Sequence, residues 1–502
     1  MSQSLFTVLH RRYGPPETQL SRREVLRAAL AASAGLLISG CRAGGLTGRG
    51  SAGRVIIVGA GFAGLACAYE LQSAGYKVTV IEARRRVGGR VLSFNDPNKT
   101  SFIPGRNVEG GAELIGLNHP TWQAYAQQFK LPLMELSESE ASAPIFLQGK
   151  MLSDEQGERL YEEMDAAFSA LTTDAVDIDA ERPWLSPRAE HWDSMSVASR
   201  LESVEATPLA RYAAMVQLSA DNAVGADHQS YLGLLAAIKG GGLERYWTHS
   251  ETHRCRGGNQ SLAFALAKAV GERNIMLGIP VSAIDVAEHI VRVTLADGRL
   301  LEADEVVLAV PPSLWDSIAI HPELPRTLRP QMGVAMKYLT QVRSRFWEAE
   351  GRSPDAFSDG PIAMTWESTD GQEGEDGVGL TGFTGGPACA RFMEGGAATG
   401  KQELGMLYPS FKDNFVQERI MAWPRDPWTK AGYSFPAPGQ VTAHGPTLYE
   451  GLGRLHFAGE HACYQFCGYM EGALYSGADL ARRIAARDGV VSVRHSSAGI
   501  HR

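Results

Sequence analysis

Three glycines and one glutamate have the spacing of a dinucleotide-binding turn. The β-branched run at residues 54–58, RVIIV, predicts a buried parallel strand, and Gly59, Gly61 and Gly64 follow it as G-x-G-x-x-G. The first glycine permits a tight turn, the second lets a pyrophosphate approach the backbone, and the third lets a helix pack closely on the strand. Glu82 ends the next strand, where a ribose-binding carboxylate is expected. The sequence therefore predicts a site for a dinucleotide.

A lysine inside an apolar strand is a second candidate for chemistry. Lys337 lies in the run VAMKYLTQVRSRFW. A charged amine among β-branched and aromatic residues costs free energy unless it faces a cavity or a partner. The strand pattern alone favours the simpler interpretation, an exposed lysine at a strand edge.

Length and composition limit the partners of the chain. Its 502 residues exceed one ordinary core and predict two packed domains. A formal net charge of −8 argues against nucleic acid or an anionic lipid surface as a bulk partner. Six scattered cysteines do not resemble a disulfide scaffold, and no paired C-x-x-C spacing supports a metal site. We therefore expect neither a metal ion nor a nucleic-acid partner.

The first fifty residues have the pattern of a targeting segment. Arg22 and Arg23 precede the apolar residues 28–40, a stretch too short to span a bilayer but typical of a signal peptide. The arginine pair resembles a twin-arginine signal, which predicts the Tat translocase as an export partner and a periplasmic or secreted location. A basic, alanine-rich amphipathic helix is the alternative. Cys41 ends a short lipoprotein-like box, which leaves lipid anchoring and simple cleavage equally open. We expect residues 1–53 to be a signal peptide and tether.

The residues after the second strand indicate which dinucleotide is bound. Their sequence, EARRRVGGR, is similar to the E-A-x-x-x-x-G-G-R run of flavoproteins in the flavin-containing amine oxidase superfamily. The resemblance implies FAD held by Glu82, Ala83, Arg84 and Arg90, with both arginines facing its phosphates. No second G-x-G-x-x-G follows a strand, so we expect the electrons to come from the substrate and not from NAD(P)H.

Three later segments resemble the same superfamily. The segment ending in EVVLAVPP resembles its middle part, which implies that Val281 contacts the adenine side. The segment GRLHFAGEHACYQFCGYMEGALYSGADLARRI resembles its last motif. This implies that Glu460 binds the ribityl or phosphate end and that Met470 lies in a turn under the pyrimidine ring, where a helix N-terminus stabilises negative charge. The segment AWPRDPWTKAGYSFPAPG implies Trp423 as a neighbour of the flavin.

The resemblance also assigns the reacting side of the cofactor. Lys337 matches the superfamily's lysine that holds a water against flavin N5. Tyr469 matches one wall of the aromatic cage of monoamine oxidases, which steers the amine and attracts a cationic ammonium. We expect these two residues to be catalytic.

The second cage wall departs from the monoamine oxidase pattern. Its tyrosine and the flavin-linking cysteine fall on Gly432 and Ala431 in this chain. Without a thiol there, we expect FAD to be held noncovalently. Trp428 or Tyr433 could close the cage, and the sequence leaves that choice open.

The resemblance implies a two-domain α/β flavoprotein, with a Rossmann-like FAD-binding domain and a discontinuous α+β substrate domain. The expected reaction is oxidative deamination of a primary amine or L-amino acid, in which a hydride passes to the flavin and oxygen reoxidises it to give hydrogen peroxide. The alternatives are an amine dehydrogenase that passes electrons to a quinone or cytochrome, a desaturase acting on C–C bonds, and a flavin-loaded binding protein. We leave a homodimer open. The predicted FAD-binding segments are 54–115, 251–334 and 446–485, the substrate-binding segments are 116–250 and 335–445, and the tail is 486–502.

The substrate class is the least determined part. Where L-amino acid oxidases of the snake-venom kind place an arginine after G-G-x, this chain has Glu113. This favours an amine, or an amino acid whose carboxylate is held elsewhere, for example by Arg254. We expect Glu113 to bind substrate, and Glu113, Glu244 or Glu251 could attract a second cationic group, as in arginine, lysine or a diamine.

Overall fold

The computed structural model describes residues 4–15, 52–95, 100–137, 139, 141–373 and 377–490. The predicted export signal, with Arg22, Arg23 and Cys41, lies outside these residues, as does most of the predicted tail. Each helix in the described part of the chain is too short or too polar to cross a membrane.

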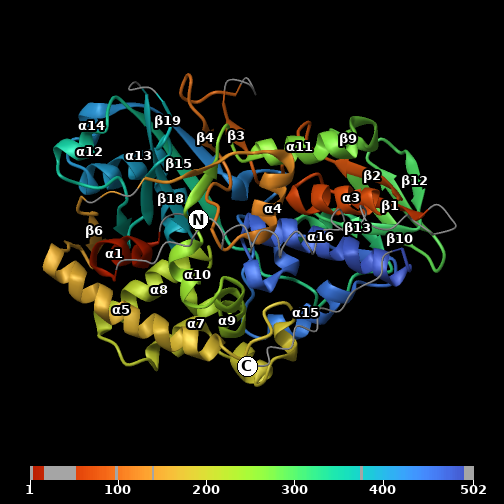
Figure 1. The fold of residues 1–502 in the computed structure, drawn as a ribbon, viewed down its shortest axis with the longest axis horizontal. Coiled ribbons are helices and arrows are strands. Elements are labelled where there is room, and N and C mark those ends of the chain that lie inside the picture. The colour runs from red at the N-terminus through yellow and green to blue at the C-terminus, as the bar shows by residue number, and fades with distance from the viewer. Residues whose placement is uncertain are drawn as a thin grey trace.

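A five-stranded parallel sheet is the centre of the predicted FAD-binding lobe (Figure 1). Its strand order, β20–β13–β1–β2–β9, joins segments far apart in the chain. Because the strands are parallel, their carboxyl ends meet at one edge, where open α/β sheets bind ligands. The strands are β1 (Ala52–Val58), β2 (Tyr76–Glu82), β9 (Ile275–Leu277), β13 (Glu305–Leu308) and β20 (Leu455–Phe457).

Helices and a second sheet cover the two faces of this parallel sheet. Helices α3 (Phe62–Ser73), α11 (Gln260–Val270) and α16 (Met470–Arg487) pack together in one apolar cluster with the inner residues of β1 and β2. The other residues of β1 and β13 pack against an antiparallel sheet in a separate cluster. Burial on both faces explains the continuous apolar run of β1. The antiparallel sheet consists of β10 (Val281–Val286), β11 (Val291–Leu295), β12 (Leu300–Ala303) and the parallel edge strand β14 (Ala319–His321).

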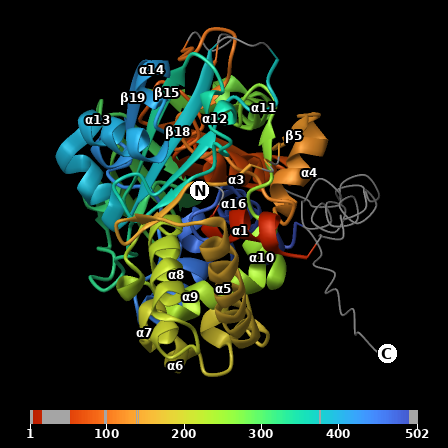
Figure 2. The same ribbon diagram turned by 90° about the vertical axis from the view of Figure 1, so that its left-hand side faces the viewer.

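A seven-stranded sheet forms the second lobe, and its strand β15 carries Lys337 (Figure 2). Strand β15 pairs antiparallel with β18 and β19, so that Lys337 lies opposite Phe383 and Met421. Helix α13 (Pro387–Leu407) covers one face. In order across the sheet the strands are β19 (Phe415–Ala422), β15 (Ala335–Val342), β18 (Val378–Gly385), β17 (Met364–Glu367), β16 (Phe357–Ser358), β6 (Ile145–Leu147) and β7 (Lys150–Met151).

A layer of helices lies below this sheet in Figure 2. Its longest member is capped by Ser153, whose hydroxyl accepts from the backbone N–H of Gln156 while the Gln156 side chain accepts from the Ser153 N–H, a capping box. The layer consists of α5 (Asp154–Ala175), α6 (Ala189–Ser194), α7 (Val197–Glu202), α8 (Pro208–Asp221), α9 (Tyr231–Gly240) and α10 (Glu244–His249). Smaller elements are β3 (Ser93–Phe94), β4 (Val108–Glu109), α12 (Phe346–Ala349), α14 (Phe411–Asn414) and α15 (Gln440–Glu450).

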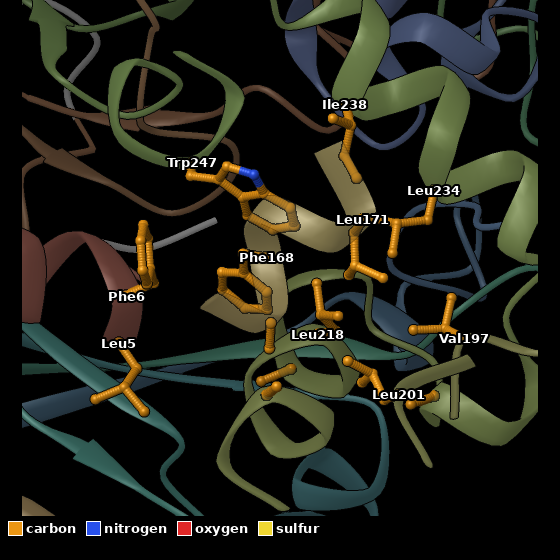
Figure 3. Close-up of a cluster of buried hydrophobic side chains, with 14 of the residues drawn as sticks. Leu5, Phe6, Phe168, Leu171, Val197, Leu201, Leu218, Leu234, Ile238 and Trp247 are labelled. Atoms are coloured by element: carbon orange, nitrogen blue, oxygen red, sulfur yellow. The ribbon is translucent and has the colours of Figure 1, made fainter. Parts of the chain in front are cut away.

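Helix α1 (Leu5–Tyr13) corrects the expectation that the first fifty residues contribute nothing to the fold. Leu5, Phe6 and Leu9 are buried in the core of the helical layer. Figure 3 shows Leu5 and Phe6 in this cluster. The ring of Phe6 packs edge-on against Phe168, with 5.1 Å between ring centroids. This helix could not be predicted from the sequence, because a short amphipathic helix ahead of a signal-like segment resembles the start of a leader.

Helix α4 (Pro120–Phe129) lies within the range predicted for the substrate domain but packs on the FAD-binding lobe. The backbone N–H groups of Thr121 and Trp122 each donate to the Glu471 carboxylate of α16 at 2.8 Å. Trp122 belongs to the same apolar cluster as α3 and α16. The chain crosses between lobes at the following two-stranded sheet, β5 (Leu133–Glu135) paired with β8 (His253–Cys255).

Candidate active site

A cavity of about 680 Å³ lies between the two lobes, at the carboxyl edge of the parallel sheet. Most of the predicted site residues line it, although they come from distant segments. Those that do are Gly59, Gly61, Glu82, Ala83, Arg84, Arg90, Val281, Lys337, Trp423, Trp428, Tyr433, Glu460, Tyr469 and Met470. Gly64 and Glu113 do not line it.

Gly59 and Gly64 have steric reasons to be glycine, whereas the backbone at Gly61 is open. Gly59 has a φ of 111°, and a Cβ there would lie 2.7 Å from the carbonyl oxygen of Ala309. A Cβ on Gly61 would meet only the Cα of Gly89 at 3.9 Å, so this backbone is open to the cavity. A Cβ on Gly64 would lie 2.0 Å from the Gly59 carbonyl oxygen. Gly64 thus supports the turn from behind, where α3 approaches β1.

The acidic residue at the end of β2 is held by backbone donors. The two carboxylate oxygens of Glu82 accept from the N–H groups of Ala60 and Arg84, each at 2.8 Å. The guanidinium of Arg84 bonds the Asp426 carboxylate and, at 2.8 Å, the Thr429 hydroxyl. Arg84 therefore connects the FAD-binding lobe to the loop that carries Trp428. Some of its guanidinium N–H groups are occupied by this loop and are not free to bind a phosphate.

Glu460 is the centre of a buried polar network at the other end of the cavity. Its carboxylate accepts from Arg90 Nη1 at 2.8 Å, Ser434 Oγ at 2.6 Å and the Gly468 N–H at 2.9 Å. Burial acts to raise the pKa of Glu460, but Arg90 and these donors hold it below its usual value. Gly468 has a φ of 83°, so the turn before α16 needs glycine here. The network positions this turn and therefore Tyr469.

The structure places Tyr433 beside the turn that carries Tyr469. A Cβ on Gly468 would lie 2.9 Å from Cδ2 of Tyr433, which shows how closely this ring packs on the turn. The Tyr433 hydroxyl donates to the Asp221 carbonyl oxygen at 2.7 Å, which fixes the ring. Trp428 instead follows Asp426, whose carboxylate accepts from its backbone N–H at 2.9 Å, near Arg84.

The predicted substrate role of Glu113 does not fit its position. Its side chain is fully buried, and its carboxylate accepts from Lys337 Nζ at 2.5 Å and from Trp366 Nε1 at 2.9 Å. Arg254 Nε lies 2.9 Å from the other carboxylate oxygen. Although burial acts to raise the pKa of Glu113, Lys337 and Arg254 hold it below its usual value. The Glu113 carboxylate is therefore occupied by Lys337 and Arg254, and neither Glu113 nor Arg254 lines the cavity.

The predicted cation-binding glutamates separate in the structure. Glu244 is exposed at the start of α10. Glu251 is buried and, with Asp221, lines a cavity of about 20 Å³ that shares Tyr469 with the large cavity. The Oδ1 atom of Asp221 has no hydrogen-bond partner among the described residues. Burial raises the pKa of Glu251 to about 8 and that of Asp221 to about 7. A cation bound next to such buried carboxyls would stabilise their ionised forms.

Some cavity and network residues were missed at the sequence level. Phe383 and His461 line the large cavity, Tyr246 lines the small one, and Trp366 bonds Glu113. Single aromatic residues in strands and helices have the same sequence signal as core residues. His461 sits within the last motif and could have been noticed there.

Comparison with known proteins identifies the family of this chain. The sequence model described as flavin-containing amine oxidoreductase matches residues 62–485. The protein belongs to this family. A flavin-containing amine oxidase of Oncorhynchus mykiss is 27% identical over 467 residues, covering 86% of this chain and 85% of that protein. An L-amino acid dehydrogenase of Synechocystis sp. is 25% identical over 460 residues, covering 86% and 94%.

Solved structures of this flavoenzyme type share the fold. A putrescine oxidase variant with redesigned cofactor binding is 25% identical, with a TM-score of 0.79, over 87% of this chain and 99% of that one. Cyclohexylamine oxidase from Brevibacterium oxydans has a TM-score of 0.76 at 24% identity, with the same coverage. The two-domain α/β flavoprotein fold and the FAD-dependent oxidoreductase class are thereby confirmed.

The cavity of this flavin-containing amine oxidoreductase fits FAD. Both ring nitrogens of His461 are buried without a hydrogen-bond partner among the described residues, and burial lowers the pKa of this histidine to about 4. A neutral histidine can donate to or accept from a ribityl hydroxyl. Together with the open backbone of Gly61 and the Glu82 carboxylate, it offers the polar groups that a dinucleotide needs. Position 431 is alanine, and none of the described cysteines lines the cavity, so the cofactor has no thiol to bond there.

Proposed function

We propose that the protein oxidatively deaminates a primary amine or an L-amino acid, with molecular oxygen as the electron acceptor. The observation that carries this proposal is that Lys337 and Tyr469, from different lobes, line the same cavity as the glycine turn and Glu82. When bound, FAD supplies the acceptor for the hydride that leaves the amine-bearing carbon. Putrescine oxidase and cyclohexylamine oxidase among the similar structures, and amine oxidases among the relatives, support an amine substrate.

Different side chains of the cavity have different roles in this reaction. Tyr469 and Tyr433 form two adjacent aromatic walls, which orient the neutral amine for hydride transfer. Lys337 supplies an N–H donor that can hold a water in the same cavity. This water is the source of the oxygen atom when the imine is hydrolysed to an aldehyde or keto acid and ammonia. A C–C desaturase needs neither the amine-orienting walls nor this water.

The acid pair in the small cavity favours a substrate with a second cationic group. A volume of about 20 Å³ suits a single water-sized group such as an ammonium. Asp221 and Glu251 could bind that ammonium while Tyr469 contacts the alkyl chain between the two amines. A diamine or a basic L-amino acid is therefore the preferred candidate.

Anaerobic mixing with a panel of substrates tests the proposal. We expect the visible absorbance of the flavin to disappear with diamines or basic amino acids faster than with monoamines of the same length. Asp221→Asn combined with Glu251→Gln should remove that preference while leaving monoamine oxidation unchanged, and Glu244→Gln serves as the exposed control. Absence of bleaching with every amine and amino acid in the panel would contradict amine oxidation.

The electron acceptor is tested after reduction. We expect air to restore the flavin colour with formation of one hydrogen peroxide per substrate oxidised. The relative named L-amino acid dehydrogenase makes an acceptor other than oxygen the second candidate. Slow reoxidation of the flavin by air, together with fast reoxidation by a soluble quinone, would indicate that the protein is a dehydrogenase and not an oxidase.

We further propose that the Tat translocase exports the protein, which is then periplasmic or secreted, with lipid anchoring at Cys41 and simple cleavage nearby as the two alternatives for its maturation. The Arg22–Arg23 pair and the following apolar stretch support this proposal. A cofactor that is loaded during folding also favours a translocase that carries folded proteins.

A further inference from the structure

Lys337 lies in a buried charge cluster with Glu113 and Arg254, two residues for which the sequence predicted no role in catalysis. Lys337 Nζ lies 2.5 Å from Glu113 Oε2 and donates to the Glu109 carbonyl oxygen at 3.2 Å. Arg254 lies 2.9 Å from the other oxygen of Glu113. The side chains of Lys337, Glu113 and Arg254 are exposed by 6%, 0% and 4%, so solvent screens none of these charges effectively.

The other partners of the cluster fix its geometry. Trp366 Nε1 donates to Glu113 Oε1 at 2.9 Å, and the Lys337 ammonium lies 5.3 Å from the centre of the Trp366 ring. Asn259 Nδ2 donates to the Glu113 carbonyl oxygen at 2.6 Å, and Arg254 Nη2 donates to the Glu367 carbonyl oxygen at 2.8 Å. Strand β17, which carries Trp366 and Glu367, therefore holds both Glu113 and Arg254.

The charges of the cluster do not cancel. Among the three side chains, one carboxylate faces one ammonium and one guanidinium, which leaves one positive charge in excess while the nearby Glu109 carboxyl is protonated. Only the ammonium end of the cluster lines the large cavity, because Glu113 and Arg254 lie behind it. Removal of one partner of a buried ion pair leaves the other uncompensated. Without Glu113, the remaining ammonium and guanidinium would be like charges in a site of low dielectric.

We propose that Glu113 is a positioning residue that keeps Lys337 protonated and directed into the cavity, and that Arg254 leaves the assembly with a net positive charge toward the reduced cofactor. Glu113 thus acts through Lys337 and does not bind substrate. The inference deepens the proposed amine oxidation and rests on it for the identity of the site, but its main test needs no amine substrate.

The test measures how many protons the holoenzyme takes up when two electrons are added. Photoreduction of the FAD-loaded protein in weakly buffered solution with a pH dye gives this number across the pH range. In the wild type, we expect the ion pair with Glu113 to keep the proton on Lys337 in both redox states, so that this side chain takes up none. In Glu113→Gln, we expect Lys337 to release its proton as pH rises and to regain it from solvent on reduction. This variant should therefore take up one proton more than the wild type at the alkaline end.

Two further variants separate Lys337 from its neighbours. Lys337 contacts the backbone carbonyl of Glu109, and burial raises the pKa of the Glu109 carboxyl to about 7, so the titration of Glu109 has to be separated from that of Lys337. The additional proton should vanish in Glu113→Gln combined with Lys337→Met, although Glu109 is still present there. Glu113→Asp keeps the charge and should retain the wild-type proton number, as should the exposed control Glu244→Gln.

The result also bears on reoxidation. At a still higher pH, where Lys337 of the reduced Glu113→Gln protein stays unprotonated and the additional proton no longer appears, this variant should react with oxygen about tenfold more slowly than the wild type, because the cavity wall then lacks a positive charge. An unchanged proton number in Glu113→Gln at every pH would overturn the proposal.

Failure of the single variant to fold is also informative. If Glu113→Gln yields no FAD-loaded protein, adding Lys337→Met should restore loading, because it removes the unbalanced ammonium. Absence of that rescue would count against the proposal. If no amine reduces the wild-type flavin, the proposed function fails, whereas the proton measurement still decides the role of Glu113.

Discussion

Replacement of Glu460 by glutamine should destabilise the holoenzyme by about 3–5 kcal/mol, the usual cost of breaking a buried ion pair from one side. The Glu460 side chain is 4% exposed and accepts from Arg90, Ser434 and the Gly468 backbone. A glutamine offers one acceptor oxygen, and its NH₂ group would point at donors. Each buried donor left without a partner costs about 1–3 kcal/mol. Arg90 is 25% exposed and can regain some water, which favours the lower end of the range.

Urea unfolding followed by the fluorescence of released FAD measures this loss. Glu302→Gln is a matched control, because Glu302 pairs with Arg292 at 3.2 Å but its side chain is 44% exposed. Exposed pairs of this kind contribute about 0–1 kcal/mol. Because Glu460 also fixes the turn of Tyr469, its variant should bind FAD more weakly and reduce it more slowly. A Glu460→Gln protein no less stable than the control would refute the reasoning.

The effect of Glu460→Gln on stability should depend on pH. The pKa of Glu460 is lower in the folded protein than the ordinary value of 4.5, because Arg90 and the hydrogen-bond donors outweigh burial. A depressed carboxyl pKa contributes stability that is present above the unfolded-state value and is lost as pH falls through the folded-state value. The stability difference between wild type and Glu460→Gln should therefore be constant above about pH 5 and shrink under more acidic conditions.

Four further predictions concern other parts of the molecule. Acid denaturation should release the FAD into solution, since Ala431 cannot form a thioether; yellow colour that stays with the precipitate would contradict this. Phe6→Ala should lower the free energy of unfolding by about 3–5 kcal/mol in the full chain, as measured by urea titration, because the ring is buried in the core. An effect under about 1 kcal/mol would mean that α1 does not pack there in solution. Tyr469→Ala should slow anaerobic flavin reduction more than it weakens substrate binding, which stopped-flow traces over a substrate series separate. Replacing Arg22 and Arg23 by lysines should abolish export, and normal accumulation outside the cytoplasm would show another route.

The parts of the site that follow from local pattern could be predicted from the sequence. The G-x-G-x-x-G turn depends on steric limits within a few residues, so Gly59, Gly61 and Gly64 could be given separate roles that the structure supports geometrically. Glu82 follows from the end of the next strand in the same unit. The parallel sheet was likewise predictable, because a buried strand, a helix and another strand appear in direct succession.

Pairings between distant segments could not be predicted in this way. Glu113 and Lys337 lie 224 positions apart, and nothing near Glu113 indicates that a lysine and an arginine will meet its carboxylate. From the sequence alone, Glu113 after G-G-A has no visible partner, and the sequence therefore predicts that it binds the substrate. The choice between Tyr433 and Trp428 depends on which of them packs on the Gly468 turn, and that contact is set by the loop as a whole.

Helix α1 has a consequence for any maturation of the chain. It precedes the predicted signal, while its side chains belong to the core of the helical layer. A protease that cuts between Gly14 and Ala52 would sever it from the chain without breaking its contacts with Phe168 and Trp247. The product would be two polypeptides held together only by noncovalent contacts. Because Ser4 and Thr7 line the small cavity next to Tyr469, departure of the short piece would open that cavity to solvent.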